Sequence, residues 1–198
     1  MKKKRKITSS FVMLFCIAMM LVLACCTTVR KDEETVSNVP ASNSEPVRNS
    51  GKKVYFAGPL FSKAEKDFNL ELTHVLEEFG YEVFLPQRDG VEAAQLEGKS
   101  EEELIRMIFE LDCSHIDEAD IVFMVTDGRV PDEGACVELG IAYAKNKRCY
   151  GVKTDTRSIE KNIDLNPMIV GCFRKLFTNY DGDDLIEELR QYLSENDL

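Results

Sequence analysis

Three carboxylates, Asp112, Asp132 and Glu138, carry the clearest indication of chemistry in this sequence. Glu138 is the one charged residue between Gly134 and Ala144, in a segment otherwise made of small or apolar residues. A buried carboxylate without a cationic neighbour has a raised pKa, and no cationic residue stands three or four positions from Glu138. We therefore expect Glu138 either to face water from a thin polar edge or to face a cleft, where its charge acts on a ligand.

The two aspartates have structural as well as chemical interpretations. Asp132 starts the predicted helix of Glu138, where an aspartate commonly caps the helix, and Asp112 could be a solvated residue of the preceding helix. Asp132 and Glu138 are less than two helical turns apart, so both can line one pocket. Carboxylates around a cleft suit chemistry at an anomeric carbon. One attacks or stabilises the positive carbon, and another handles the proton of the leaving group.

The elements that must position these residues alternate between strand and helix. Short β-rich or apolar runs predict strands at 52–58, 81–86, 120–128, 149–153 and 175–178. Helical spacing predicts helices ending near Gly80, over 101–117, around Glu138 and from about residue 183, with an irregular stretch over 154–172. This alternation predicts an α/β fold with a mostly parallel sheet of about five strands.

Two helices carry specific packing expectations. The helix over 101–117 has its apolar residues on one side, and we expect that side to face the core: Leu104, Ile108, Leu111 and Ile116. The helix of Glu138 is apolar all round, which predicts a buried helix rather than an amphipathic one.

Polar and turn-forming residues follow the first three predicted strands. Ligands of open parallel sheets bind outside the carboxyl ends of the strands. The segments FAGPLF, LPQRDG and VTDGRVPDEG occupy these positions, which makes Gly58, Gln87 and Asp127 candidate substrate contacts. Gly134 joins them, because a small residue near Glu138 would let a substrate approach the helix closely.

The first 51 residues differ from the rest of the chain. A basic cluster, KKKRK, precedes an apolar run from Phe11 to Cys26, which is the layout of a secretory signal. LVLAC resembles a bacterial lipobox, so we predict a lipoprotein-type signal peptide at 1–24 and lipidation of Cys25. An ordinary signal and an uncleaved anchor are the alternatives. Residues 25–51 are polar, which predicts a flexible tether, and we predict that residues 52–198 form the domain.

Charge and cysteine spacing exclude several classes of function. From residue 51 onward, 17 Lys and Arg face 31 Asp and Glu, a net charge of −14. Such a domain repels phosphate backbones, so we expect no nucleic-acid partner, and membrane contact would fall to the lipid anchor. Cys113, Cys136, Cys149 and Cys172 show no C-x-x-C spacing. We expect free thiols, no zinc or other metal, and no cofactor.

From residue 53 to about 180, the chain resembles the nucleoside 2-deoxyribosyltransferase family. The resemblance rests on KVYFAGPLF, LPQ, LDCSHIDEADIVFMVTD, PDEGACVELGIAYA and NPMI, and the fourth, with its D-x-G-x-x-x-E-x-G pattern, is the most specific. It implies a Rossmann-like, flavodoxin-like three-layer α/β sandwich with a five-stranded parallel sheet. It also implies transfer of 2-deoxyribose between nucleobases through a covalent sugar–enzyme intermediate, and therefore nucleosides and free bases as ligands.

The resemblance also assigns catalytic roles. Glu138 would attack C1′ of the sugar, and Tyr55 would contact this nucleophile and keep it placed. Asp112 or Asp132 would protonate the departing base, and the resemblance does not say which of them does so. Gln87 would contact the base, although a simple loop amide fits its position equally well.

A further element of the family reaches into a neighbouring subunit. Asn166 and Met168 match the N-x-M element, in which Asn166 would hold the 5′-hydroxyl of the sugar, so the resemblance implies at least a dimer with shared active sites. Asn166 could instead be a turn residue before Pro167, and proline is a departure from the family at this position. The export signal is a second departure, because the family is mostly intracellular.

Three functions remain open on the sequence alone. The first is an exported, lipid-anchored deoxyribosyltransferase of the bacterial cell envelope. The second uses water as acceptor and is an N-glycoside hydrolase of deoxynucleosides or deoxynucleoside monophosphates. The third is a lipoprotein that binds nucleosides without turning them over. The low density of basic residues around the motifs favours a free nucleoside over a monophosphate.

Overall fold

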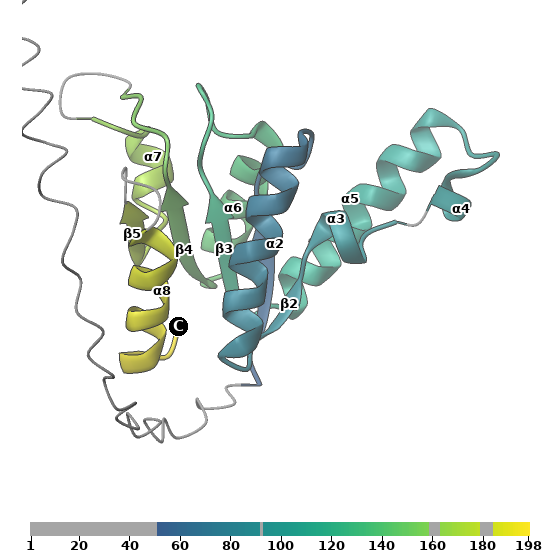
Figure 1. Cartoon of the computed structure of the whole chain (residues 1–198). Helices are drawn as coiled ribbons and strands as arrows, with labels where there is room; N and C mark the ends of the chain where they lie inside the picture. The colour runs from purple at the N-terminus through teal and green to yellow at the C-terminus, as the bar shows by residue number, and fades with distance from the viewer. Residues whose placement is uncertain (1–50, 92, 159–162, 179–183) are drawn as a thin grey trace, which may run out of the picture. The chain divides into compact units, whose positions relative to one another are not determined.

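Five parallel strands form the centre of the domain. The computed structural model describes residues 51–91, 93–158, 163–178 and 184–198 (Figure 1). The sheet has the order β2-β1-β3-β4-β5, built from β1 (Lys53–Ala57), β2 (Glu82–Phe84), β3 (Ile121–Val125), β4 (Arg148–Lys153) and β5 (Lys175–Thr178). The prediction of a three-layer α/β fold with five parallel strands is confirmed. The predicted signal peptide, tether and lipidated Cys25 lie outside the described residues, apart from Gly51.

Four longer helices cover the sheet, two on each face (Figure 1). α2 (Lys63–Glu78) and α8 (Asp184–Glu195) pack on one face, and α5 (Glu101–Glu118) and α6 (Glu133–Ala144) on the other. Three short helices complete the described part: α3 (Pro86–Asp89), α4 (Ala93–Leu96) and α7 (Pro167–Val170). α7 lies in the stretch for which the sequence predicted irregular structure. Among the described residues, no helix is both long and apolar enough to span a bilayer.

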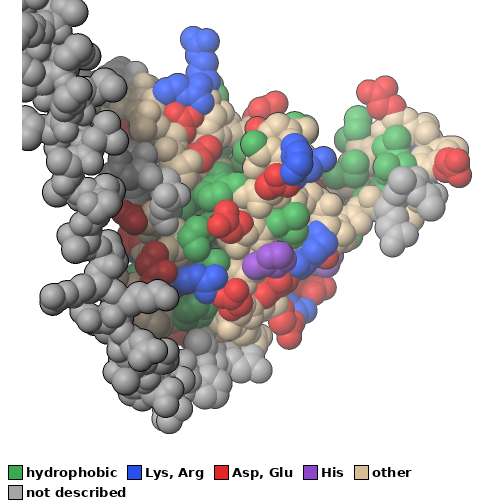
Figure 2. All heavy atoms as spheres, viewed as in Figure 1, with side chains coloured by type: hydrophobic (Ala, Val, Ile, Leu, Met, Phe, Trp, Pro, Cys, Tyr) green, Lys and Arg blue, Asp and Glu red, His purple; other side chains and the backbone are tan. Residues whose placement is uncertain are grey.

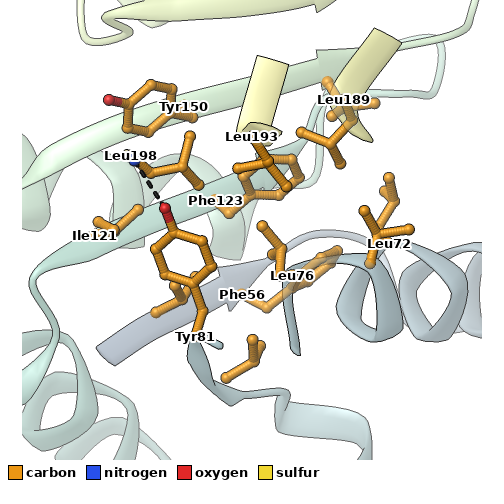
Figure 3. Close-up of a cluster of buried hydrophobic side chains, with 14 of the residues drawn as sticks. Phe56, Leu72, Leu76, Tyr81, Ile121, Phe123, Tyr150, Leu189, Leu193 and Leu198 are labelled. Atoms are coloured by element: carbon orange, nitrogen blue, oxygen red, sulfur yellow. Dashed lines mark hydrogen bonds between the residues drawn. The ribbon is translucent and has the colours of Figure 1, made fainter. Parts of the chain in front are cut away.

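The face under α2 and α8 holds the larger core (Figure 3). Strand residues with even numbers in β1 and odd numbers in β3, such as Phe56 and Phe123, point into it, as the two-residue period of a strand requires. Leu72 and Leu76 of α2 meet them and have no exposed surface. Burial of these apolar side chains is the main source of stability for this layer.

The amino ends of the strands are closed by the last residues of the described chain. The Tyr81 hydroxyl accepts a hydrogen bond from the Leu198 amide at 2.8 Å, drawn in Figure 3, and donates one to the Asp197 carboxylate at 3.0 Å. Leu198 itself is fully buried. Lys52 forms an ion pair with Asp197, so the domain begins at this same edge.

The face under α5 and α6 holds a smaller core, in which Tyr55 and Met124 of the sheet meet Ile116 of α5 and Leu139 of α6. The prediction for α5 was wrong in part, since Ile116 is its one buried residue. The amino-terminal half of α5 extends beyond the edge of the sheet (Figure 1), so the sheet does not cover the apolar side of that half. Ile105, Ile108 and Phe109 are exposed there.

α6 also departs from its prediction. Its buried residues are Ala135, Leu139 and Ala142, whereas Val137 and Tyr143 are more than half exposed. A helix that is apolar all round therefore turns one apolar side to the surface.

Helix ends follow ordinary capping chemistry: Ser62 and Ser100 begin α2 and α5 with capping boxes, and Gly80 follows α2 with a positive φ of 83°, as expected of its predicted cap position.

Candidate active site

Glu138 and Tyr55 meet at the face of the sheet covered by α5 and α6. Tyr55 is fully buried in β1, and its hydroxyl donates a hydrogen bond to Oε1 of Glu138 at 2.9 Å. Burial raises the pKa of Glu138 to about 7, and the negative charges of Asp112 and Asp132 act in the same direction, while the Tyr55 bond opposes them. Glu138 therefore belongs to a partly buried polar cluster, which disfavours the first of its two sequence interpretations, and its action on a ligand stays a prediction.

Asp112 belongs to the same cluster although it comes from a different helix. Burial raises the pKa of Asp112, against the opposing influence of Tyr55 and His115. The pKa of Tyr55 is raised as well, first by burial and then by the charges of Glu138 and Asp112. Two carboxyl groups with raised pKa values, Glu138 and Asp112, thus lie beside Tyr55 in one partly buried site, and perturbed pKa values of this kind are common at catalytic sites.

Asp132 performs the capping role that was one of its predicted alternatives. Its Oδ1 accepts a hydrogen bond from the Ala135 amide at 2.8 Å at the start of α6. The same carboxylate is close enough to Glu138 to raise the pKa of Glu138. Gly134 is exposed beside it, and a Cβ at Gly134 would stand 3.1 Å from Oδ1 of Asp132. The glycine therefore leaves room for the cap as well as for an approaching ligand.

Gly58 and Asp127 lie at the carboxyl ends of β1 and β3, as expected. A Cβ at Gly58 would stand 3.2 Å from Cβ of Val125, so a side chain there would crowd the neighbouring strand. Asp127 is engaged by the chain after β4: its carboxylate accepts hydrogen bonds from the amides of Thr154 and Asp155, at 2.7 and 2.9 Å, and from the Thr154 hydroxyl. These bonds give Asp127 a structural role, and substrate contact by Asp127 stays a prediction.

Gln87 lies in α3, after β2, with its amide held against α2. Its Oε1 accepts a hydrogen bond from Nδ2 of Asn69 at 3.1 Å, and its Nε2 donates one to the Lys66 carbonyl at 2.8 Å. Nδ2 of Asn69 also donates to the Pro59 carbonyl at 2.8 Å. Asn69 was not singled out from the sequence. Its signal is a polar residue three positions before Leu72, on the stripe of α2 that faces the core.

Among the described residues, no hydrogen bond joins Asn166 or Met168 to Glu138. Asn166 caps α7, where its Oδ1 accepts from the Met168 amide at 2.9 Å, and the Met168 side chain is 81% exposed. α7 borders an apolar groove of about 570 Å³ that Gly140 and Tyr143 of α6 also line. Gly140 is two residues from Glu138 and therefore on the opposite side of the helix.

His115 is a second residue that the sequence did not single out. Its ring stacks on Phe84 with 3.6 Å between centroids, and Phe84 stacks on Tyr55 at 5.7 Å. Its charge, when protonated, also acts on Asp112. A histidine three residues after Asp112 on one helix is the signal that would have found it. Phe84 thus packs on the face of the Tyr55 ring and restricts its rotation, which helps to hold the hydroxyl toward Glu138.

Comparison with known proteins places this geometry in context. Residues 54–195 match the family model described as nucleoside 2-deoxyribosyltransferase. The comparison with curated proteins gives no match.

Solved structures with the same fold include a 2-deoxyribosyltransferase from Bacillus psychrosaccharolyticus and a conserved protein from Enterococcus faecalis V583. The first is 25% identical, with a TM-score of 0.58, and the match covers 71% of this chain and 91% of that one. The second is also 25% identical, with a TM-score of 0.56, covering 71% and 98%. A CMP N-glycosidase from Clostridium botulinum is 21% identical with a TM-score of 0.50, covering 71% and 99%, which is a likeness of fold alone.

Proposed function

Because the chain belongs to the nucleoside 2-deoxyribosyltransferase family, we propose that it transfers 2-deoxyribose from one nucleobase to another. The observation that supports this most directly is the 2.9 Å hydrogen bond between Tyr55 and Glu138, in a site where burial and two aspartates raise the pKa of Glu138. Such a carboxylate is poorly solvated and held in one place, which suits a nucleophile.

The proposed reaction has two displacements at C1′ of the sugar. In the first, a carboxylate oxygen of Glu138 bonds to C1′ while the bond from C1′ to the base nitrogen breaks, and the leaving base takes a proton. In the second, a nitrogen of the incoming base bonds to C1′, the ester to Glu138 breaks, and the proton returns to the acid. Two inversions retain the β configuration of the nucleoside.

Asp112 is the better candidate for the acid. Oδ1 of Asp132 is committed to the Ala135 amide, whereas burial raises the pKa of Asp112. The Tyr55 hydroxyl has a single proton, which it donates to Oε1 of Glu138, so it stabilises a charge on Glu138 more than one on Asp112. In the productive form the shared proton of the cluster resides on Asp112 and the charge on Glu138.

A base-exchange assay tests the proposal and separates it from the two alternatives. The protein is incubated with deoxyinosine and adenine. Deoxyadenosine is the product expected of a transferase, and free deoxyribose without deoxyadenosine would identify an N-glycoside hydrolase. Binding without release of hypoxanthine would identify a nucleoside-binding protein. Rapid quenching followed by peptide mass analysis should detect deoxyribose on the peptide that contains Glu138, and unmodified peptide during exchange would refute the nucleophile.

We further propose that the active protein is a homo-oligomer in which α7 of one copy completes the site of another. Within one copy, Met168 and the groove it borders lie on the side of α6 away from Glu138, so they need a second copy to reach such a site. The groove offers apolar surface for that contact. The extended part of α5 offers more, and its apolar side chains are seen in Figure 2.

A complementation experiment tests the shared site. Glu138→Gln and Asn166→Ala variants should each be nearly inactive alone, and mixing them under conditions that exchange subunits should restore activity. Glu138→Gln mixed with a second Glu138 variant is the matched control and should stay inactive. Failure of the first mixture to recover, together with a monomeric mass, would overturn the shared site.

Export and lipid attachment at Cys25 form a separate proposal, supported by the basic cluster, the apolar run and LVLAC. It places the enzyme on the membrane of a bacterial cell envelope. Cys25→Ala should stop lipid incorporation and release or stall the protein, measured by labelling with an alkyne fatty acid and by membrane fractionation. Unchanged membrane retention and labelling would rule out lipid at that position.

A further inference from the structure

Asn69 is a buried polar residue that ties together two of the loops at the carboxyl edge of the sheet. It is 2% exposed, and its Nδ2 donates to the Pro59 carbonyl after β1 and to Gln87 after β2. Among the described residues its Oδ1 has no hydrogen-bond partner. A buried acceptor without a partner costs stability, so an apolar side chain would be the more stable choice here unless the two N–H bonds are needed.

The partners fix the orientation of both amides. The carbonyls of Pro59 and Lys66 can only accept hydrogen bonds, so each must face an amide nitrogen. The Pro59 carbonyl therefore sets Asn69 with its nitrogen inward, and this nitrogen in turn requires the oxygen of Gln87. The Lys66 carbonyl requires the nitrogen of Gln87 on the other side. If the Gln87 amide were turned over, its nitrogen would face Nδ2 of Asn69 and its oxygen would face the Lys66 carbonyl, so both hydrogen bonds would be lost.

This orientation determines what Gln87 can offer to a ligand. One lone pair of its oxygen and one N–H of its nitrogen remain, each on a fixed side. A freely turning glutamine exchanges the two and accepts either pattern. Purines differ at position 6 in this respect, because an amino group donates and a carbonyl accepts.

We propose that Asn69 is a positioning residue that fixes the amide of Gln87 and so makes the base site discriminate between 6-amino and 6-oxo bases. The inference rests on the proposed function and on the base contact that the family resemblance implies for Gln87. Asn69 itself touches neither base nor sugar in this scheme. Its effect passes through the orientation of one amide.

The test compares deoxyadenosine with deoxyinosine, which share a purine ring and differ at position 6. The ratio of kcat/KM for base release should depart from one by roughly tenfold in the unmodified protein, the scale of one well-placed amide–base pair. Asn69→Leu keeps the size of the side chain and removes both donors, so the bond from Gln87 to the Lys66 carbonyl alone then opposes turning the Gln87 amide over. It should bring the ratio to within about threefold of one, while the sugar still becomes attached to Glu138.

Two further variants make the result specific. Gln87→Leu should also lose discrimination, and adding Asn69→Leu to it should change the ratio no further, because both act through one contact. Thr73→Val is the matched control: Thr73 is buried one turn along α2 and its hydroxyl also has no partner among the described residues. This control should keep the original ratio. If Asn69→Leu does not fold, Asn69→Ser, which keeps one donor, should show an intermediate ratio.

The outcomes separate this inference from the function on which it rests. No base release from any deoxynucleoside would overturn both. Base release with a ratio near one in the unmodified protein, or with an unchanged ratio in Asn69→Leu, would overturn the role of Asn69 and leave the transferase in place.

Discussion

The two faces of the sheet differ in how much apolar surface they bury and in the charged groups that they hold. Under α2 and α8, apolar side chains interlock and the end of the described chain is tied down by Tyr81. Under α5 and α6 the core is smaller, acidic groups with raised pKa values gather around Tyr55, and apolar side chains of both helices are exposed. Burial of apolar side chains on the α2–α8 face stabilises the domain. This offsets the cost of holding carboxylates on the α5–α6 face, where water solvates them poorly.

The desolvated carboxylates of this molecule are concentrated where the chemistry is proposed. Desolvating a carboxylate costs free energy, and a fold tolerates it when burial elsewhere compensates. Changes on the α5–α6 face should therefore affect rates more than stability, and changes on the α2–α8 face the reverse.

The largest expected effect is on the rate of base exchange. Glu138→Gln should lower it by at least roughly 10³-fold, because the amide cannot form the sugar ester. Thermal unfolding should occur at the same temperature or higher. Glu133→Gln, an exposed carboxylate on the same helix, is the matched control and should change neither quantity. A near-normal rate in Glu138→Gln would contradict the assignment of the chemistry to the α5–α6 face.

The second effect is on stability, and it concerns the opposite face. Leu76→Ala opens a cavity in the core under α2, which should lower the free energy of unfolding by about 3 kcal/mol. Urea denaturation measures this, with kcat of the folded fraction unchanged. Ile105→Ala, at a position that is 62% exposed on α5, should leave stability unaltered. Equal losses in the two variants would contradict the comparison.

The third effect is a pH dependence of stability that belongs to Glu138. Its pKa is about 7 when folded and near 4.5 when unfolded, so the folded state binds the proton more tightly. The contribution of Glu138 to the free energy of unfolding is therefore largest below pH 4.5. It decreases by on the order of 3 kcal/mol as the pH rises to about 7 and beyond. Denaturant titrations at pH 5 and pH 8 should show this fall in the unmodified protein and a smaller one in Glu138→Gln.

A smaller effect should follow loss of the Tyr55 hydroxyl. Tyr55→Phe removes the hydrogen bond that lowers the pKa of Glu138, so the acidic limb of the profile of kcat/KM against pH should move to higher pH. The rate at pH 7 should fall roughly tenfold. Tyr143→Phe, on the exposed side of α6, should leave the profile unchanged. A shift toward lower pH would contradict the assigned direction.

The smallest effect on the single chain should come from α5. Phe109 is 59% exposed on the part that extends from the sheet, so Phe109→Ser should change stability by no more than about 0.5 kcal/mol. Sedimentation should nevertheless show weaker self-association, because an apolar contact between copies is lost. Unchanged association would assign the oligomer to another surface.

Much of the framework was predictable because its signals are local. The strands follow from short β-rich runs, whereas the pairing of Tyr55 with Glu138 was implied only by the family resemblance. The fate of the apolar stripe on α5 was not predictable, since periodicity identifies an apolar side without indicating whether the same chain covers it.

The remaining surprises concern side chains whose partners are distant in sequence. From the sequence alone, Asp127 after β3 is compatible with binding a ligand and equally with binding the amides of Thr154 and Asp155, which come 27 and 28 positions later. The link between Asn69 and Gln87 joins two loops that only the fold brings together. Helix starts are easier, because the cap made by Asp132 depends on its immediate neighbours alone.

The position of Lys52 has a practical consequence. The domain begins at the amino edge of the sheet, beside Asp197, whereas the loops around Gly58 and Gln87 leave from the carboxyl edge. A resin coupled to a handle placed before residue 51 would therefore hold the protein by the edge remote from its chemistry. Such a biocatalyst should keep the carboxyl edge of the sheet toward the flowing solution, whereas random coupling through lysines would orient a fraction of the molecules with that edge against the bead.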